Sequence, residues 1–180
     1  TLDTTSGSLN YVNKITGLSN PSFLAIHPTK KYLFATREPD TSDEEGAVLS
    51  FSFDKETGAL TFLNEQPSMG TSSCHMNVDR TGKYLLASNY GSGSVAVFPI
   101  NPDGTLGDKS DFIQHTGSSV HPRRQKGPHA HSITVAPSNR FAYAADLGID
   151  KVLIYEFNAM TGKLTPSAQS SVDVTPGSGP

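Results

Sequence analysis

The stretch VDRTGKYLLA, residues 78–87, decides the fold of this chain. It runs from an apolar segment through a polar turn into a second apolar segment, which an aromatic residue opens. The same arrangement stands at residues 26–35 as IHPTKKYLFA and at residues 135–144 as VAPSNRFAYA. Three copies of one strand–turn–strand pattern indicate an internal repeat, and a repeat determines the fold class before any single element does.

A second short pattern interleaves with the first: a small polar residue, glycine, one variable residue and leucine. Its glycines are Gly7, Gly58, Gly104 and Gly162. They stand 51, 46 and 58 residues apart, and the last three follow β-like runs at residues 48–54, 95–101 and 152–158. Glycine after such a run indicates a hairpin turn, where it takes the positive φ that a tight connection demands.

Each repeat unit therefore holds four short strands. In the second unit we expect them at residues 74–78, 84–89, 94–100 and 110–115. Four antiparallel strands repeated along a chain are typical of β-propeller blades, whereas a sandwich would show no long-range self-similarity. We predict an all-β protein, a β-propeller of four-stranded antiparallel blades. A generic all-β domain with chance glycine turns is the alternative.

The repeat also predicts how the chain divides. We expect residues 1–20 to hold the outer strand of a preceding blade, residues 21–70 and 127–180 one blade each, and residues 71–126 a blade with a long basic loop. Propellers have typically 4–8 blades, so an arc of about three blades cannot close a ring. We therefore expect an open arc, with further blades of the same chain after Pro180 that close it.

Composition narrows the function classes. The chain has 14 Lys and Arg against 17 Asp and Glu, a formal charge of −3, which argues against a globally basic nucleic-acid binder. No apolar run approaches the roughly 20 residues of a membrane helix, and no basic-then-apolar signal peptide opens the chain. We expect no membrane partner and a cytoplasmic protein. The single cysteine, Cys74, excludes an internal disulfide and a Cys-rich zinc site.

Three sets of residues carry a specific resemblance to a known family. They are NPS at residues 20–22 with IHP at 26–28, CH at 74–75 with NYGSGS at 89–94, and KGPHAH at 126–131 with ADLG at 145–148. In this order they resemble the seven-bladed lactonase family, which contains the propeller-type 6-phosphogluconolactonases and the fungal carboxy-cis,cis-muconate cyclases. The resemblance implies a seven-bladed ring, a chain of roughly double this length, and neither metal nor cofactor.

Blade geometry predicts where chemistry could sit, because the first strand of each blade lines the central channel. Counting ten residues back from the aromatic residues Tyr32, Tyr84 and Phe141 gives Ser22, Cys74 and His131. These equivalent positions carry three different side chains, as expected where symmetry is kept for folding and broken for function. One mouth of the channel should be lined by Ser22, Arg37, Glu38, Cys74, His75, Asn89, His129 and His131.

The resemblance singles out His131. In the muconate-cyclase branch the matching position is a proposed catalytic histidine, whose partners, an arginine and a glutamate, would here follow Pro180. An imidazole that titrates near neutrality can take a proton from water and give one to a leaving alkoxide, and lactone hydrolysis needs both steps. The alternative is a structural histidine that bonds backbone carbonyls in the channel wall. Without its partners, we expect the 180-residue stretch alone to be inactive.

His129 and His131 stand two residues apart, so on a strand both side chains point to one face. His-x-His is also a metal-ligand spacing, but no acidic or cysteine ligand follows until Asp146. We therefore expect His129 to bind substrate. Cys74 could act as a nucleophile beside His75, but neighbours in a strand point to opposite faces, which favours a buried structural thiol.

Residues 112–145 hold no Asp or Glu and include Arg123, Arg124 and Lys126 just before His131. Arginine forks match phosphate oxygens bidentately, so this loop could hold the phosphate of a sugar-acid lactone. A solvated basic loop is the alternative, and no aromatic stacking platform supports nucleic-acid binding.

Lactone hydrolysis is the function that we predict, with 6-phosphogluconolactone as substrate and the pentose phosphate pathway as its setting. His131 would activate water. The residues that we expect to bind the sugar-acid lactone are Arg37, Glu38, His75, Asn89, Arg123, Arg124 and His129. A carboxy-muconate-type cycloisomerase and a non-catalytic propeller scaffold are the alternatives.

Overall fold

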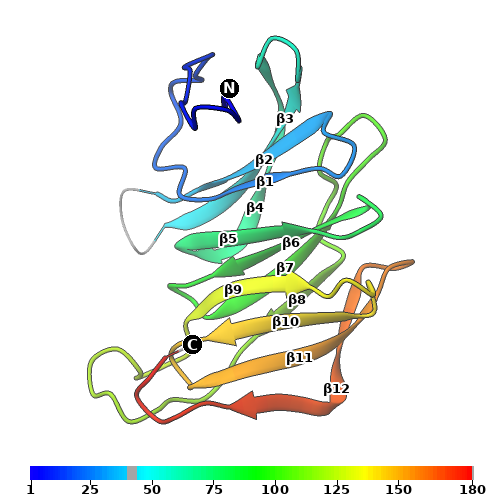
Figure 1. The fold of residues 1–180 in the computed structure, drawn as a ribbon. Coiled ribbons are helices and arrows are strands. Elements are labelled where there is room, and N and C mark those ends of the chain that lie inside the picture. The colour runs from blue at the N-terminus through cyan, green and yellow to red at the C-terminus, as the bar shows by residue number, and fades with distance from the viewer. Residues whose placement is uncertain (40–43, 180) are drawn as a thin grey trace.

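The structure is a computed structural model that describes residues 1–39 and 44–179. Within these residues it contains twelve strands and no helix, arranged as three four-stranded antiparallel sheets in chain order (Figure 1). The first sheet consists of β1 (Leu24–Ile26), β2 (Tyr32–Arg37), β3 (Glu45–Phe53) and β4 (Leu60–Thr71). The second consists of β5 (Ser73–Val78), β6 (Tyr84–Asn89), β7 (Ser94–Pro99) and β8 (Asp111–Gln114). The third consists of β9 (Ala130–Val135), β10 (Phe141–Asp146), β11 (Lys151–Asn158) and β12 (Lys163–Asp173).

The predicted fold class is confirmed: the sheets are three blades of a β-propeller, and the strands of the second lie within a residue or two of their predicted places. The hairpin glycines are confirmed as well. Gly58, Gly104 and Gly162 have φ values of 67°, 87° and 66° and connect the third strand of each blade to the fourth. A positive φ of this size is strained for any residue with a Cβ.

The two sequence patterns belong to one packing arrangement. A Cβ on Gly104 would lie 2.2 Å from the Tyr32 ring, and a Cβ on Gly162 would lie 2.3 Å from the Tyr84 ring. The hydroxyl groups of the same tyrosines donate to the next blade, Tyr32 to the Pro102 carbonyl and Tyr84 to the Met160 carbonyl, both at 3.0 Å. The aromatic residue of one repeat thus packs on the turn glycine of the next, which explains why the patterns keep step.

Alternating residues send the two faces of the second blade into different cores. On β6, Leu85 and Ala87 pack in the first interface, against Phe34 of the first blade. Tyr84 and Leu86 of the same strand pack in the second interface, against the third blade. Successive side chains of a strand point to opposite faces of the sheet. A blade that has a neighbour on each side therefore needs apolar residues on both faces. The central blade is consequently the most deeply buried part of the chain.

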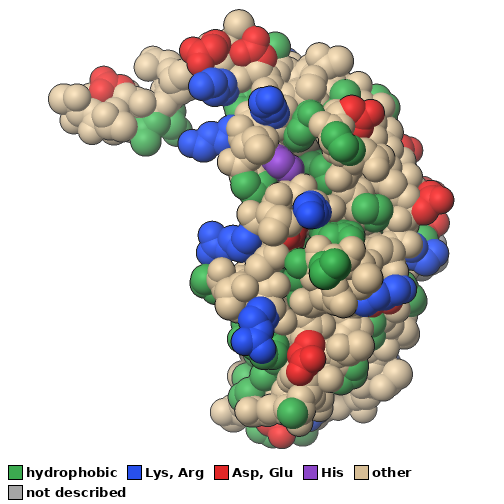
Figure 2. Space-filling model, turned by 90° about the vertical axis from the view of Figure 1, so that its right-hand side faces the viewer, with side chains coloured by type: hydrophobic (Ala, Val, Ile, Leu, Met, Phe, Trp, Pro, Cys, Tyr) green, Lys and Arg blue, Asp and Glu red, His purple; other side chains and the backbone are tan. Residues whose placement is uncertain are grey.

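The first strands of the blades, β1, β5 and β9, lie next to one another and form the inner wall of the arc (Figure 1). In the view of Figure 2 the molecule is a crescent that is hollowed on one side. This open arc is the predicted one. Residues 1–20 form no strand there, only a bridge between Leu2 and Leu9, and Ile15 and Leu18 pack on the core of the first blade. Their assignment to a preceding blade, with the other unit boundaries, stays a prediction.

Candidate functional site

The candidate site lies where the inner strands begin. The pairing of β5 with β6 skips Cys74, and the pairing of β9 with β10 skips His131, so each residue is the extra one of a β-bulge. A bulge redirects the side chain of the extra residue, and bulges are over-represented next to active sites. Cys74 and His131 therefore occupy equivalent, redirected positions in neighbouring blades.

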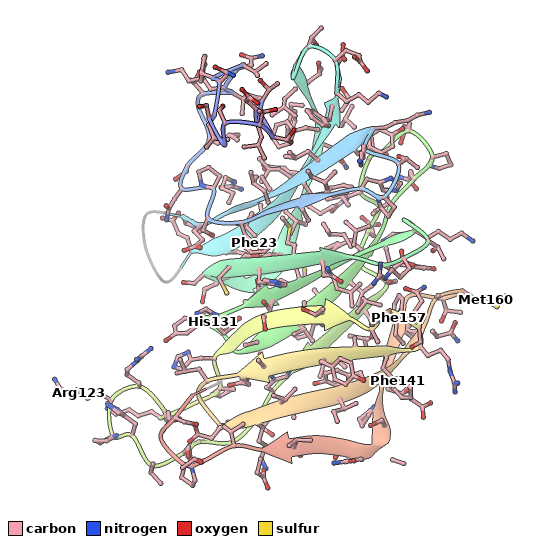
Figure 3. All side chains as sticks on the ribbon, viewed as in Figure 1. Phe23, Arg123, His131, Phe141, Phe157 and Met160 are labelled. Carbon is pink, nitrogen blue, oxygen red and sulfur yellow. The ribbon has the colours of Figure 1, made fainter. Side chains whose placement is uncertain are left out.

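Ser22, which the repeat predicts to be equivalent to Cys74, and Cys74 itself both contact the next inner strand. The Ser22 hydroxyl donates to the Ser73 carbonyl at 3.4 Å, and Cys74 Sγ lies 3.4 Å from the His131 carbonyl. His131 comes third in this series, and its side chain is exposed on the inner wall (Figure 3). Within the described residues no hydrogen bond holds the His131 ring, so its nitrogens are free for a substrate.

Cys74 does not have the environment of a nucleophile. Burial raises the pKa of its thiol, and the negative charge of Glu38 raises that pKa further. Because the thiolate is the reactive form, a raised pKa makes the thiol inert. Glu38 thus lies near enough to act on the Cys74 thiol electrostatically, and its role at the mouth stays a prediction.

His75 lies beside His131 on the inner wall. Its Nδ1 accepts the backbone N–H of Ile133 at 3.3 Å, which puts the ring proton of the neutral form on Nε2. The Phe23 ring packs against it at a centroid distance of 4.3 Å. Burial lowers the pKa of His75, and the nearby charge of His131 lowers it further. His75 is thus held as a neutral N–H donor next to an exposed imidazole.

His129 and His131 share an aromatic neighbour, Tyr90. The His129 ring stacks on Tyr90 at 4.5 Å, and the His131 ring meets the same residue edge-on at 5.5 Å. His129 also donates from Nδ1 to the Tyr90 carbonyl at 2.8 Å. The structure therefore brings both histidines of the HAH motif to one rim, where His129 is half-buried and fixed while His131 is exposed.

The structure does not bring Asn89 or Arg37 to this group, which corrects their predicted positions. Asn89 is fully buried in the first interface, where its Nδ2 donates to the Ser68 carbonyl and to Ser94. Arg37 is directed to Glu65 of its own blade, 3.4 Å away. Both share the strand face of a residue that points away from the following blade, Leu85 for Asn89 and Ala35 for Arg37. These strand ends therefore do not turn their side chains into the channel.

Arg123 and Arg124 are exposed at the tip of the loop between β8 and β9. In Figure 3 the labelled Arg123 projects outward, away from His131. Asp150 holds the base of this loop. Its carboxylate accepts the backbone N–H groups of Gly177 and Gly179 at 2.7 and 2.9 Å, and a hydrogen bond with Ser119 is the largest of the contacts that lower its pKa to about 2.

No three His, Cys, Asp or Glu side chains within residues 1–39 and 44–179 lie close enough together to bind a metal ion. The described part of the chain also contains no helix that could cross a membrane.

Comparison with known proteins shows the family to which this arrangement belongs. The family described as lactonase, 7-bladed beta-propeller, matches residues 1–180, and the chain belongs to that family. It is 37% identical to the 6-phosphogluconolactonase of Bacillus subtilis and 28% identical to that of Formosa agariphila, in each case over 99% of this chain. The solved structure of the periplasmic gluconolactonase PpgL of Pseudomonas aeruginosa superimposes with a TM-score of 0.90 at 32% identity over 99% of this chain.

These matches concern part of each relative. The chain covers 49% and 50% of the two 6-phosphogluconolactonases and 51% of PpgL. It therefore spans about half the length of the curated relatives that it matches.

Two contributors to the site were not predicted from the sequence: Phe23, which covers His75, and Tyr90, which contacts both histidines. A signal for Tyr90 exists. It directly follows the strand end at Asn89, at the position that Glu38 occupies in the first blade, and Glu38 was predicted to lie at the mouth.

Proposed function

We propose that the protein to which this chain belongs hydrolyses a sugar-acid lactone, and that 6-phosphogluconolactone is the substrate. The observation that carries the proposal is the exposed His131 beside the neutral donor His75 on the inner wall. Membership of the lactonase family and the names of the relatives support the same reaction class.

In this proposal His131 exchanges the protons of the reaction. Its neutral imidazole takes a proton from water as the water oxygen attacks the lactone carbonyl carbon. As the ring C–O bond breaks, the imidazolium gives that proton to the leaving oxygen, which becomes a hydroxyl group. The carbonyl carbon becomes a carboxylic acid, which releases the second proton of the water to solvent and leaves as a carboxylate. Each transfer needs a pKa near the working pH, which histidine provides.

His75 takes the part of an electrostatic donor. Its Nε2–H can hydrogen-bond to the carbonyl oxygen, on which negative charge develops during attack. Because burial and the His131 charge lower its pKa, His75 stays a neutral donor when His131 carries the proton. This assignment replaces Asn89, whose amide is buried between blades. The arginine and glutamate partners of His131 would come from blades outside residues 1–180.

The phosphate is assigned to Arg123 and Arg124. They are exposed, and the structure gives neither of them a carboxylate partner within the described residues, so their guanidinium groups are available to an anion. Hydrogen bonds from Ser119 and Gln125 to Asp150 tie the loop that carries them to the third blade. A remote anion clamp of this kind contributes mainly uniform binding. A phosphorylated sugar acid also fits a cytoplasmic protein of the pentose phosphate pathway, although PpgL is periplasmic.

The test of the reaction is hydrolysis of 6-phosphogluconolactone by the full-length protein and its His131→Ala variant. Loss of a general acid–base group should lower kcat by about 10²–10⁴-fold. A wild-type protein that binds but does not hydrolyse lactones would indicate a scaffold. A wild-type protein that cyclises carboxy-muconate in preference to hydrolysing sugar lactones would indicate a cycloisomerase.

The test of the substrate is a double variant, Arg123→Ala with Arg124→Ala. It should raise KM for the phosphorylated lactone by about tenfold or more, as expected for lost charge-assisted hydrogen bonds. Its KM for unphosphorylated gluconolactone should stay the same. An equal loss for both lactones would remove the phosphate assignment and leave hydrolysis standing.

A further inference from the structure

A buried polar network crosses the second interface immediately behind the candidate site. His115, which follows β8 of the second blade, places Nδ1 2.6 Å from Asp146 Oδ2 of the third blade, and both side chains are fully buried. Nε2 of the same ring lies 3.1 Å from the Tyr155 hydroxyl on β11. Three polar groups from two blades are thereby joined in a line that no solvent reaches.

Tyr155 stands at the outer end of this network. Burial and the negative charge of Asp146 raise the pKa of Tyr155, so the phenol keeps its proton and can donate it to Nε2 of the His115 tautomer that carries its proton on Nδ1. The imidazole then donates from Nδ1 to Asp146. The carboxylate ends the line as an acceptor, and a buried carboxylate needs further donors.

Those donors belong to the segment that carries the candidate site. The other oxygen of Asp146 accepts the backbone N–H of His129 at 2.7 Å and that of Gly148 at 2.9 Å. The Leu147 N–H donates in turn to the His129 carbonyl at 3.0 Å. The main chain at His129 is thus held on both sides, one residue before the bulge begins.

Backbone packing leaves this segment no room to shift. A Cβ on Gly148 would lie 2.0 Å from the Gly127 carbonyl oxygen and 2.7 Å from the His129 nitrogen. The Gly127–His129 backbone is therefore pressed against the turn that follows Asp146, and any change in the position of the Asp146 carboxylate must move His129.

We propose that Tyr155, His115 and Asp146 are positioning residues for His131: they fix the main chain of His129 and, through it, the bulge that aims the His131 ring. The inference rests on the proposed function. The alternative is that the network only stabilises the contact between the second and third blades. The positioning role is favoured because the first interface forms without such a network. At the position equivalent to Asp146 it has the neutral Asn89, which bonds to Ser68 and Ser94.

The test compares two buried tyrosines that each donate one hydrogen bond across the second interface. Tyr155→Phe removes the hydroxyl that orients His115, whereas Tyr84→Phe removes the bond to the Met160 carbonyl at 3.0 Å. Tyr84 has no link to His129, so it serves as the matched control. Both variants are made in the full-length protein and assayed on 6-phosphogluconolactone.

Tyr155→Phe should lower kcat about tenfold at unchanged KM, a part of the roughly 10²-fold loss that a 1 Å misplacement can cause. His115→Leu should lower it further. His115→Asn should recover part of that loss, because its amide can donate to Asp146 where Nδ1 does. By NMR, the His129 amide should exchange faster in Tyr155→Phe and at the wild-type rate in Tyr84→Phe.

Equal kcat and equal His129 exchange in Tyr155→Phe and Tyr84→Phe would overturn the positioning role. If His131→Ala retained full activity, the proposed function would fail instead. If His131→Ala were inactive while the two tyrosine variants behaved alike, the proposed function would stand without this inference.

Discussion

The two interfaces between blades differ at one equivalent position. The second and third blades end their second strands with Asn89 and Asp146, and both side chains are fully buried and face the preceding blade. Asn89 meets neutral oxygens in the first interface, and its own Oδ1 has no partner among the described residues. Asp146 meets His115 and two backbone N–H groups in the second.

The apolar parts of the two interfaces are similar in kind, so packing the blades together does not need a charge. The first interface is closed by residues such as Phe34, Met76 and Phe98, the second by residues such as Leu86, Ile133 and Phe157. Burying a carboxylate costs free energy unless hydrogen bonds offset the loss of water. The difference shows that, of the two equivalent positions, the buried carboxylate occupies the one where it also bonds to the main chain of the segment carrying His129 and His131.

Exchanging the residue types at the two positions should have the largest effect on the free energy of unfolding. Asn89→Asp places a carboxylate where the hydrogen-bond partners of Asn89 are the uncharged Ser68 carbonyl and Ser94. An uncompensated buried charge should cost about 3–5 kcal/mol of the free energy of unfolding. Asp146→Asn keeps an acceptor for the His129 N–H and should cost less, about 1.5–3 kcal/mol, as expected for hydrogen bonds to a charged group. Urea unfolding of both variants at neutral pH measures the difference.

Acid provides the control for this exchange. Burial raises the pKa of a carboxyl group, so the carboxylate introduced by Asn89→Asp would become protonated on mild acidification, and this variant should recover part of its stability. Equal costs for the two variants, or no recovery of Asn89→Asp at lower pH, would contradict the account.

The glycines two residues beyond these positions sharpen the comparison. A Cβ on Gly148 would meet a backbone carbonyl oxygen at 2.0 Å, whereas a Cβ on the equivalent Gly91 would first meet the Thr71 side-chain hydroxyl at 2.4 Å. A side chain can move and a hydrogen-bonded backbone cannot. Gly148→Ala should therefore cost about 3 kcal/mol and Gly91→Ala about 1 kcal/mol, the two ends of the range for overpacking.

Thermal unfolding of the two alanine variants tests this difference. Gly148→Ala should also lower lactonase kcat, because it displaces His129. A Gly91→Ala variant as unstable as Gly148→Ala would show that the third blade holds this segment no more tightly than the second.

The blades could be predicted from the sequence because their signals are physically coupled. Tyr32 and Tyr84 pack on Gly104 and Gly162, so the spacing of aromatic residues and glycines records the contact between neighbouring blades. Counting from the same aromatic residues gave Cys74 and His131 as equivalent positions, and both are the extra residue of a bulge. What the count does not contain is the direction of side chains at strand ends: Asn89 was expected in the channel and points into an interface.

The network behind the site could not be predicted either. His115 and Asp146 are separated by a long loop and a strand pair, and His115 belongs to no repeated pattern. Their contact depends on how two blades dock, which no local periodicity records. The bulges are likewise a property of pairing between strands, and they decide where Cys74 and His131 point.

A smaller effect should distinguish the inner wall of the first blade from that of the second. His75 stands where the first blade has Phe23, and its pKa is lowered from 6.5 by burial and by the charge of His131. The unfolded chain therefore binds the proton more tightly, so this group's contribution to stability is complete above pH 6.5 and is lost as the pH falls below it. His75→Phe should reduce the loss of stability between about pH 7 and pH 5, measured by thermal unfolding, and a steeper loss would contradict it.

The smallest effect concerns the C-terminal segment that Asp150 holds beside the loop carrying Arg123 and Arg124. Its anchor Asp150 has a positive φ of 51°, at the position where the second blade has Gly93 with φ 65°. Hydrogen bonds lower the Asp150 pKa from 3.8 to about 2, so they stabilise the folded state above pH 3.8 and are lost as the pH falls to about 2. NMR at about pH 4, where this carboxylate is still charged, should show the amides of Gly177 and Gly179 protected in the wild type and exchanging in Asp150→Gly. Unchanged protection in that variant would refute the anchor.

The most direct test of the account is a pair of substitutions at the equivalent bulge positions of neighbouring blades, Cys74→Ala and His131→Ala, assayed for 6-phosphogluconolactone hydrolysis in the full-length protein. If the acid–base group is supplied by the third blade, His131→Ala should lose about 10²–10⁴-fold in kcat, the usual contribution of a general acid–base group. Cys74→Ala should stay within about threefold of wild type, because its thiol is inert at a raised pKa. Undiminished turnover in His131→Ala, or an equal loss in both variants, would contradict the central claim.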